Sequence, residues 1–449
     1  MSRAIRMMLT LMIALTALGA LPAAVSPAYA QDGPPQPSID SLTRDQLVVC
    51  EPDGTQASGA VYRICMPPNW WYNGDLVIYA HGYVAVTEPV AIPEDQLCLP
   101  DNGPCLPDIM NYLGYAFATT SYSTNGLAVT QGVSDVVDLV NVFAQTHGQP
   151  NHVYIIGVSE GGLVTALSTE QYPNVFDGGV ATCGPVGDFR TQVNYFGNFR
   201  AVFDYFYPGL IPGDAVNVPP ALVPVWEDYY DANIKPVIFD PANASKLQQV
   251  IAVSKAPVDS ADPVASTEKS VKDALWYQVV GTNDAMAKLG GQPFENQRTW
   301  YRGSVNDWQL NLAIQRVAAD PGALAAINAQ LQTSGVLTSP LVTMHTTLDQ
   351  QVPYAHEVFY RLKTLFAGSG LKHINIPIQR YGHCEFTTTE ALVAFGVMLA
   401  LAGDQPMNEA GVRKLLPNVD DQAQLQQMLK FYSDPANQGD VDTLGGRKP

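Results

Sequence analysis

The chain has 449 residues and a formal net charge of −18, from 24 Lys and Arg against 42 Asp and Glu. An acidic surface of this kind repels phosphate backbones, so the composition excludes a nucleic-acid-binding protein and disfavours anionic membranes as partners. The charge does not point to any activity, which has to be sought in particular residues.

The first thirty residues have the pattern of a cleavable secretory signal. Arg3 and Arg6 form a basic start, an apolar run covers 7–21, and a small-x-small site lies at 28–30. A membrane anchor is the alternative, but the run is short for a bilayer span and contains a glycine. We expect cleavage after Ala30, a secreted or periplasmic protein with no membrane span left, and a net charge of −20 once two arginines are removed.

Six cysteines in an exported chain predict disulfides, because the compartment beyond the membrane permits thiol oxidation. Two pairs are close in sequence, Cys50–Cys65 and Cys98–Cys105, and each would close a small surface loop. Cys183 and Cys384 remain. None of the six has the spacing of a zinc site, so we expect no metal, and no motif predicts a cofactor.

Beyond a Pro/Gly-rich leader, assigned to 31–45, β-type runs alternate with helical patterns. The runs that predict strands are 60–66, 76–80, 115–121, 152–157, 178–183, 340–345 and 374–380. The patterns that predict helices between and after them are 108–113, 133–146, 161–170, 355–366 and 388–402. Several strands are apolar at consecutive positions, as expected when both faces are covered. The alternation predicts an α/β fold, a mainly parallel central sheet with helices on both faces.

Residues 187–336 break the alternation. They contain no β-type run, and helical periodicity returns over 244–254, 270–280 and 310–332. Eleven aromatic residues between Phe189 and Tyr230 favour a small core of the segment's own, although as a group they are candidates to line a lid. The predicted organisation is a core of 46–186 and 337–405, a helical cap of 187–336, and a C-terminal helical extension with a polar tail over 406–449.

The sequence Gly157-Val158-Ser159-Glu160-Gly161-Gly162 joins a predicted strand to a predicted helix. This is the strand–turn–helix context of a nucleophile elbow, with the serine on the strained turn. Glycines at 157 and 161 allow the strand and the helix to approach closely, and Gly162 is expected only to add backbone freedom. We predict Ser159 as a nucleophile. The alternative is an ordinary βα turn with a serine that caps the helix.

With this motif the chain resembles the α/β-hydrolase superfamily, over about residues 60–186 and 337–405. The superfamily's order is nucleophile, acid, histidine. Asp349 follows a predicted strand and precedes Val-Pro, and His383 follows the next strand. The resemblance implies a triad in which His383 takes the proton of Ser159 and Asp349 orients the imidazole.

Other assignments of the acid and the histidine stay open. Asp349 could be a loop acid or a helix cap, but Asp177 and Asp188 follow the wrong strand. His383 could be an ordinary surface histidine, and His345 is its nearest rival. We expect His345 to be a hydrogen-bonding residue at a strand end.

The strand 76–80 ends in His81-Gly82-Tyr83, which resembles the superfamily's loop beside the nucleophile. The resemblance implies that the backbone N–H groups of Tyr83 and Glu160 stabilise the oxyanion. His81 and Gly82 are expected to support this loop structurally.

At the histidine the chain partly resembles the tannase and feruloyl-esterase family. That family joins a cysteine before its serine to one after its histidine, whereas here Cys384 follows His383 but Val158 precedes Ser159. Cys183 ends the strand after the nucleophile helix, so a Cys183–Cys384 disulfide would pin the histidine loop. Two unlinked cysteines are the alternative.

We therefore expect a secreted serine esterase for a small ester with an apolar or aromatic acyl group, by analogy with the fold. A secreted peptidase of the same fold is the main alternative, with Glu227 and Asp228 as candidates to bind a substrate ammonium. A polyester-degrading esterase and an inactive binding protein are further alternatives. The sequence gives no expectation for the oligomeric state.

Overall fold

The computed structural model describes residues 43–99, 104–404, 407–416, 422–423 and 425–426. The predicted signal, nearly all of the predicted leader and most of the polar tail lie outside these residues. The last two residues assigned to the leader are helical, because α2 begins at Arg44. Within the part of the chain that is described, no helix is both long and apolar enough to cross a bilayer.

A nine-stranded sheet forms the framework, with the order β1-β3-β5-β4-β6-β7-β8-β9 and β2 beside β3. Its strands are β1 (Val49–Cys50), β2 (Gly54–Thr55), β3 (Val61–Met66), β4 (Leu76–Ala80), β5 (Ala116–Thr120), β6 (Val153–Val158), β7 (Gly178–Thr182), β8 (Leu341–Leu348) and β9 (His373–Tyr381). Strands β5, β4, β6, β7, β8 and β9 pair in parallel, whereas β3 runs antiparallel to β5 and to β1 and β2. The carboxyl ends of the parallel strands therefore meet at one edge.

Helices cover both faces of the sheet. They are α3 (Leu106–Tyr112), α4 (Val129–His147), α5 (Glu160–Gln171), α13 (Ala355–Phe366), α14 (Thr388–Ala402) and α15 (Glu409–Leu415). Alternate residues of β4 divide between two cores: Val77 and Tyr79 pack with α3 and α14, whereas Leu76 and Ile78 pack with α4 and α5. This division follows from the two-residue period of a strand and explains why β4 is apolar throughout.

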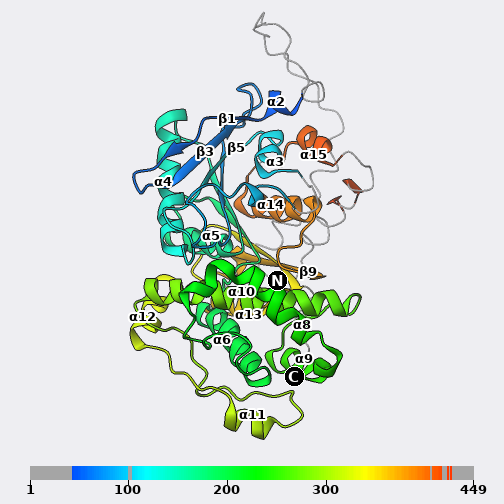
Figure 1. Cartoon of the computed structure of the whole chain (residues 1–449). Helices are drawn as coiled ribbons and strands as arrows, with labels where there is room; N and C mark the ends of the chain where they lie inside the picture. The colour runs from blue at the N-terminus through cyan, green and yellow to red at the C-terminus, as the bar shows by residue number, and fades with distance from the viewer. Residues whose placement is uncertain (1–42, 100–103, 405–406, 417–421, 424, 427–449) are drawn as a thin grey trace, which may run out of the picture. The chain divides into compact units, whose positions relative to one another are not determined.

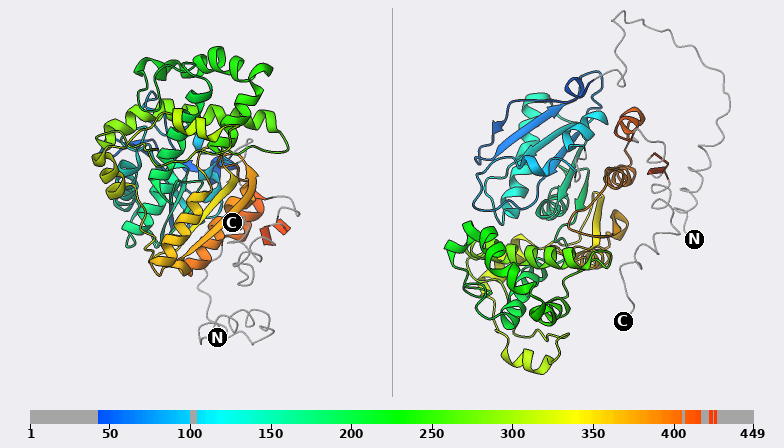
Figure 2. Two further views of the ribbon diagram at one scale, coloured as in Figure 1. Left: turned by 90° about the horizontal axis from the view of Figure 1, so that it is seen from below. Right: turned by 45° about the vertical axis from the view of Figure 1, so that its right-hand side comes forward.

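The chain between β7 and β8 contains helices and no strand. We call residues 183–340 the β7–β8 segment. Its helices are α6 (Phe189–Phe206), α7 (Trp226–Tyr229), α8 (Lys235–Ile238), α9 (Ala244–Ser254), α10 (Pro263–Leu289), α11 (Asp307–Ala313) and α12 (Pro321–Gln330). Figures 1 and 2 show these green and yellow-green helices gathered together beyond one end of the strands.

The α/β fold class is confirmed, and the seven predicted strands are present with ends within three residues of the prediction, whereas the short strands β1 and β2 were not predicted. The helical pattern expected over 310–332 corresponds to two short helices, because Pro321 starts a new helix with Asp320 at its N-cap. Helix α6 was not predicted, because its many aromatic residues obscure a helical period.

Candidate active site

Ser159 lies on the sharp turn between β6 and α5. Its backbone has φ of +58° and ψ of −121°, a left-handed conformation that costs energy for any residue with a Cβ. A Cβ at Gly157 would collide with the carbonyl oxygen of Gly161, and one at Gly161 with that of Ala80. Gly162 contributes more than freedom, because a Cβ there would lie 2.8 Å from the oxygen of Thr182. The turn needs all three glycines for space.

The structure brings Ser159, His383 and Asp349 into one chain of hydrogen bonds. His383 Nε2 lies 2.8 Å from Ser159 Oγ, and His383 Nδ1 lies 2.7 Å from Asp349 Oδ2. Ser159 follows β6, Asp349 follows β8 and His383 follows β9, so the three residues meet at the carboxyl edge of the parallel strands. With Nδ1 donating to the carboxylate, Nε2 is left as the acceptor for the serine proton.

Asp349 is completely surrounded by donors. Its Oδ1 accepts from the backbone N–H groups of Gln351 (2.8 Å) and Val352 (2.9 Å), and its Oδ2 faces His383 and His345. Burial by itself would raise the pKa of Asp349, but the charge of His383 and the hydrogen bonds from both histidines hold it well below its ordinary value. The group is therefore an ionised carboxylate, fixed in orientation.

The other acids considered from the sequence are engaged elsewhere. Asp177 accepts from the backbone N–H of Val153 at the opposite end of β6, and Asp188 caps α6. Glu227 pairs with Lys272 at 2.6 Å and its side chain is 56% exposed.

The loop 81–83 lies against the nucleophile. A Cβ at Gly82 would come within 3.2 Å of Ser159 Cβ, so the loop and the elbow are in direct contact. Gln96 holds the loop: its Oε1 accepts from Gly82 N (2.7 Å) and its Nε2 donates to Tyr83 O (3.3 Å). Because the N–H of Gly82 is occupied in this way, Tyr83 and Glu160 remain the backbone donors predicted for an oxyanion.

His81 and Gln96 both support the loop 81–83, but only His81 was expected to do so from the sequence. His81 is buried, stacks on Tyr122 and has Nδ1 2.7 Å from Gly82 O, and burial lowers its pKa. Gln96 was not identified from the sequence, because it ends a short 3-10 helix, Glu94–Gln96, and reaches the site only through the fold. Its nearness to the small loop of Cys98–Cys105 was the one available signal.

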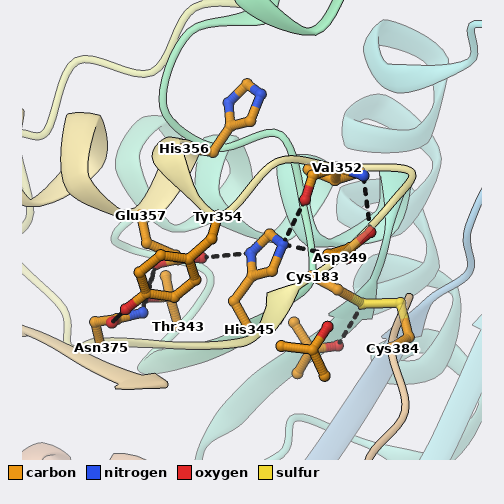
Figure 3. Close-up of polar contacts among 12 residues, drawn as sticks. Cys183, Thr343, His345, Asp349, Val352, Tyr354, His356, Glu357, Asn375 and Cys384 are labelled. Atoms are coloured by element: carbon orange, nitrogen blue, oxygen red, sulfur yellow. Dashed lines mark hydrogen bonds and ion pairs between the residues drawn. A yellow bond between two sulfur atoms is a disulfide. The ribbon is translucent and has the colours of Figure 1, made fainter. Parts of the chain in front are cut away.

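All six cysteines are paired, as Cys50–Cys65, Cys98–Cys105 and Cys183–Cys384. The third disulfide, drawn in Figure 3, links the end of β7 to the residue directly after His383, and both of its sulfur atoms lie within 4.8 Å of a ring nitrogen of His383. Both of its cysteines have positive φ, 46° at Cys183 and 57° at Cys384. The bond thus ties the histidine loop to the strand next to the nucleophile turn.

A cavity of about 140 Å³ opens beside Ser159. Its apolar wall comes mainly from the β7–β8 segment and consists of Leu127, Pro185, Phe189, Val193, Phe196, Ala215, Val216, Tyr277, Ala285, Pro293, Phe294 and Val352. Among the described lining residues the only carboxyl group is Glu160. Burial raises the pKa of Glu160 to about 8, and its Oε1 accepts from Ala128 N at 2.9 Å. At neutral pH the wall is therefore apolar and mostly uncharged.

Comparison with known proteins agrees with this geometry. Residues 110–198, which include the nucleophile turn, match the profile of the prolyl oligopeptidase family. The chain has the α/β-hydrolase fold. It is 25% identical over 242 residues to the probable feruloyl esterase B-2 of Aspergillus terreus, covering 47% of this chain and 44% of that protein.

Two further relatives show the extent of the likeness. Acetylxylan esterase A of Emericella nidulans is 31% identical over 87 residues, 18% of this chain and 28% of that protein. The chain thus matches less than half the length of either esterase. Feruloyl esterase B of Aspergillus oryzae aligns in structure with a TM-score of 0.38 at 16% identity, covering 79% of this chain and 81% of that chain.

Proposed function

We propose that the protein hydrolyses carboxylic esters through an acyl-enzyme on Ser159. The observation that carries the proposal is the hydrogen-bonded chain from Asp349 through His383 to Ser159, which ends beside an apolar cavity. Serine is too weak an acid to attack a carbonyl carbon unaided, and a neutral imidazole at 2.8 Å can accept its proton. The carboxylate stabilises the imidazolium that results.

The reaction has two balanced halves. Ser159 Oγ bonds to the ester carbonyl carbon while its proton passes to His383 Nε2, and the N–H groups of Tyr83 and Glu160 bind the oxyanion. Collapse breaks the bond to the alcohol, which leaves with the proton from His383. Water then adds to the acyl-enzyme, His383 takes its proton, and the acid is released with Ser159 restored.

The cavity favours an ester over a peptide with a free amino end. A substrate ammonium needs an ionised carboxylate, yet Glu160 is the only described carboxyl in the wall. Burial raises the pKa of Glu160 to about 8, so ionising it to bind an ammonium would cost free energy at neutral pH. The predicted alternatives, Glu227 and Asp228, do not line this cavity. Two fungal relatives carry esterase names, a feruloyl and an acetylxylan esterase. We infer an apolar or aromatic acyl group.

We further propose that residues 187–336 act as a cap, since most of the cavity wall belongs to them. A covered cavity disfavours a long polymer as substrate, which argues against the polyester alternative. Export is proposed from the signal pattern and is supported by the three disulfides, which persist in oxidising compartments.

The proposal is tested by labelling with a fluorophosphonate, followed by assays on short and long acyl p-nitrophenyl esters and on aminoacyl amides. Wild type should be labelled and should prefer esters, and Ser159→Ala should lose labelling and about 10⁴-fold or more of kcat. For wild type, kcat/KM should fall at acid pH, because a protonated imidazole cannot accept the serine proton. Labelling that survives in Ser159→Ala would reject the nucleophile, and preferred cleavage of amides would reject the substrate class.

A further inference from the structure

A second histidine, His345, lies behind the acid of the proposed triad. His345 is on β8 with 0% exposure, and its Nε2 lies 3.2 Å from Asp349 Oδ2. This is the same oxygen that His383 Nδ1 approaches at 2.7 Å. Figure 3 shows the imidazole of His345 between Asp349 and Glu357, with dashed contacts on both sides. The triad therefore continues inward as Ser159, His383, Asp349, His345 and Glu357.

Both ring nitrogens of His345 face acceptors. Nδ1 lies 3.1 Å from Glu357 Oε1, and Nε2 lies 2.9 Å from the carbonyl oxygen of Val352 as well as near Asp349. The carbonyl oxygen of Val352 has no proton to give, so Nε2 donates, and Nδ1 donates as well when Glu357 is an ionised carboxylate. A ring that donates from both nitrogens is an imidazolium.

Glu357 has the surroundings of an ionised partner. Its side chain is 1% exposed, and its Oε2 accepts from Asn375 Nδ2 (2.7 Å) and from the hydroxyl of Thr343. With His345 on Oε1, the carboxylate has donors on both oxygens, which is what allows a buried charge to persist. The cluster is one cation between two anions rather than an isolated charge.

We propose that His345 is a positioning residue: a permanently protonated imidazolium that fixes the Asp349 carboxylate and offsets its charge at His383. The inference rests on the proposed triad, because it assigns His345 a role through Asp349 and not through contact with substrate. Without the cation, the uncompensated carboxylate would favour the protonated form of His383, which cannot accept the serine proton. The enzyme would then need a higher pH to work.

The charge balance is consistent with this assignment. Burial alone would lower the pKa of His345, but the hydrogen bonds and charges of Asp349 and Glu357 raise it to about 10. The neighbouring histidines behave in the opposite way, since burial lowers the pKa of both His356 and His373 to about 3. His345 alone among these three has carboxylates against its ring.

Other titratable groups face the cluster from each packed element. They are His356, with Asp188 and Lys363 near it, His373 and Tyr381 on β9, Tyr195 on α6, and Asp273 and Tyr277 on α10. Burial raises the pKa of each of the three tyrosines further above its ordinary value, so they stay neutral. Asp188, Lys363 and Asp273 are common to wild type and to the variants below.

The wild-type protein gives the first test. Histidine labelled with nitrogen-15 should show one ring whose two nitrogens both stay protonated from about pH 6 to about pH 9. The resonance is assigned in the wild type by nuclear Overhauser contacts with the ring of Tyr354, which lies edge-on to His345, and it should survive in His373→Gln and His356→Gln. A ring of His345 that is neutral at pH 7 would overturn the proposal, and this measurement decides alone if His345→Gln does not fold.

The second test is the pH profile of kcat/KM for a p-nitrophenyl ester. His345→Gln should move the acid limb to higher pH by about one unit, because a cation near His383 has been removed. His373→Gln is the matched control: His373 is buried in the same cluster, binds the hydroxyl of Thr343 at 3.0 Å, and should leave the limb in place. A purely structural role would lower the plateau in His345→Gln without moving the limb, and that result would reject the inference.

The outcome is separable from that of the proposed function. Fluorophosphonate labelling of Ser159 reports on the nucleophile in every variant. If labelling is intact and the limb of folded His345→Gln does not move, the positioning role fails while the triad stands. If wild type is not labelled at Ser159, the proposed function itself fails.

Discussion

Two regions of the molecule meet at the cavity and differ in what they contribute. The carboxyl edge of the sheet supplies polar side chains from the ends of three strands, held on backbone that includes positive φ at Ser159, Cys183 and Cys384. The β7–β8 segment supplies most of the apolar wall, on helices whose own core contains Phe199, Phe203 and Trp226. In the proposed function, the first region places the reacting groups and the second selects which acyl groups reach them.

The two regions also satisfy their buried charges differently. At the sheet edge, charges are shared along a line from His383 to Glu357 that ends at the nucleophile. In the β7–β8 segment, the fully buried guanidinium of Arg200 pairs with Asp204 at 2.8 Å and donates to Gln278 and the carbonyl of Ile211. At the sheet edge the buried charges adjoin the proposed nucleophile, whereas in the β7–β8 segment they hold helices together. Four variants test how the two regions differ.

The largest effect is expected from Asp349→Asn. An amide cannot stabilise the imidazolium, and it can favour the wrong tautomer of His383, so kcat should fall by about 10⁴-fold while the fold is retained. Steady-state kinetics and circular dichroism measure both. Asp177→Asn is the control at the opposite end of the sheet and should stay within about threefold of wild type. Equal losses in the two variants would remove Asp349 from the triad.

Gly281→Leu addresses the wall of the cavity. Gly281 lies within α10 and lines the cavity, and an added Cβ would meet only Tyr83 Oη, at 3.8 Å. Leucine should therefore fill the cavity without disturbing the helix, and kcat/KM for a long acyl ester should fall by about 10- to 100-fold. An acetyl ester should be affected by less than about threefold.

The matched variant at this position is Gly281→Ala. It should raise the free energy of unfolding by up to about 1 kcal/mol, because alanine is the better helix former, and leave the acyl-length preference unchanged. Chain-length preference that stays the same in Gly281→Leu would show that the acyl group binds elsewhere.

Removal of the disulfide next to the histidine loop should have a smaller effect on catalysis. The double variant Cys183→Ala/Cys384→Ala should lose about tenfold in kcat, because His383 is then held less firmly at its distance from Ser159. The pair Cys50→Ala/Cys65→Ala removes a disulfide between the edge strand β1 and its neighbour β3 and should keep kcat. Thermal unfolding scans show whether both variants are folded at the assay temperature. A kcat that is unchanged in both would mean that the loop does not need the bond.

The smallest effect on catalysis is expected from Glu160→Gln, which should instead change how the free energy of unfolding depends on pH. The folded-state pKa of Glu160 is raised, to about 8, so its stabilising contribution is full below the unfolded value of about 4.5 and is lost as pH rises through about 8. Glutamine does not ionise. Between about pH 5 and about pH 9 the free energy of unfolding should thus fall less in the variant than in wild type, as measured by urea titration. Parallel curves would contradict the buried neutral acid.

The sequence by itself determined the framework of this protein. Residues 76–80 and 153–158 are apolar over most of their length, a pattern that only strands between two layers of helices produce, and the glycines around Ser159 fix a turn that admits no Cβ. These features are local in the chain. The order of Ser159, Asp349 and His383, each just after a strand, is likewise readable before folding.

Only the tertiary structure decided which side chains surround those residues. Gln96 supports the loop 81–83 from a turn, and Glu357 meets His345 from a helix twelve positions later, contacts that no local period encodes. The cavity wall joins residues from α6 and α10, and the helices α7, α8 and α9 lie between these two in the sequence. Periodicity shows which face of an element is buried, but the partner on that face depends on how the layers pack. That packing places Asp349 and Glu357 beside His345, and it sets the shape of the cavity.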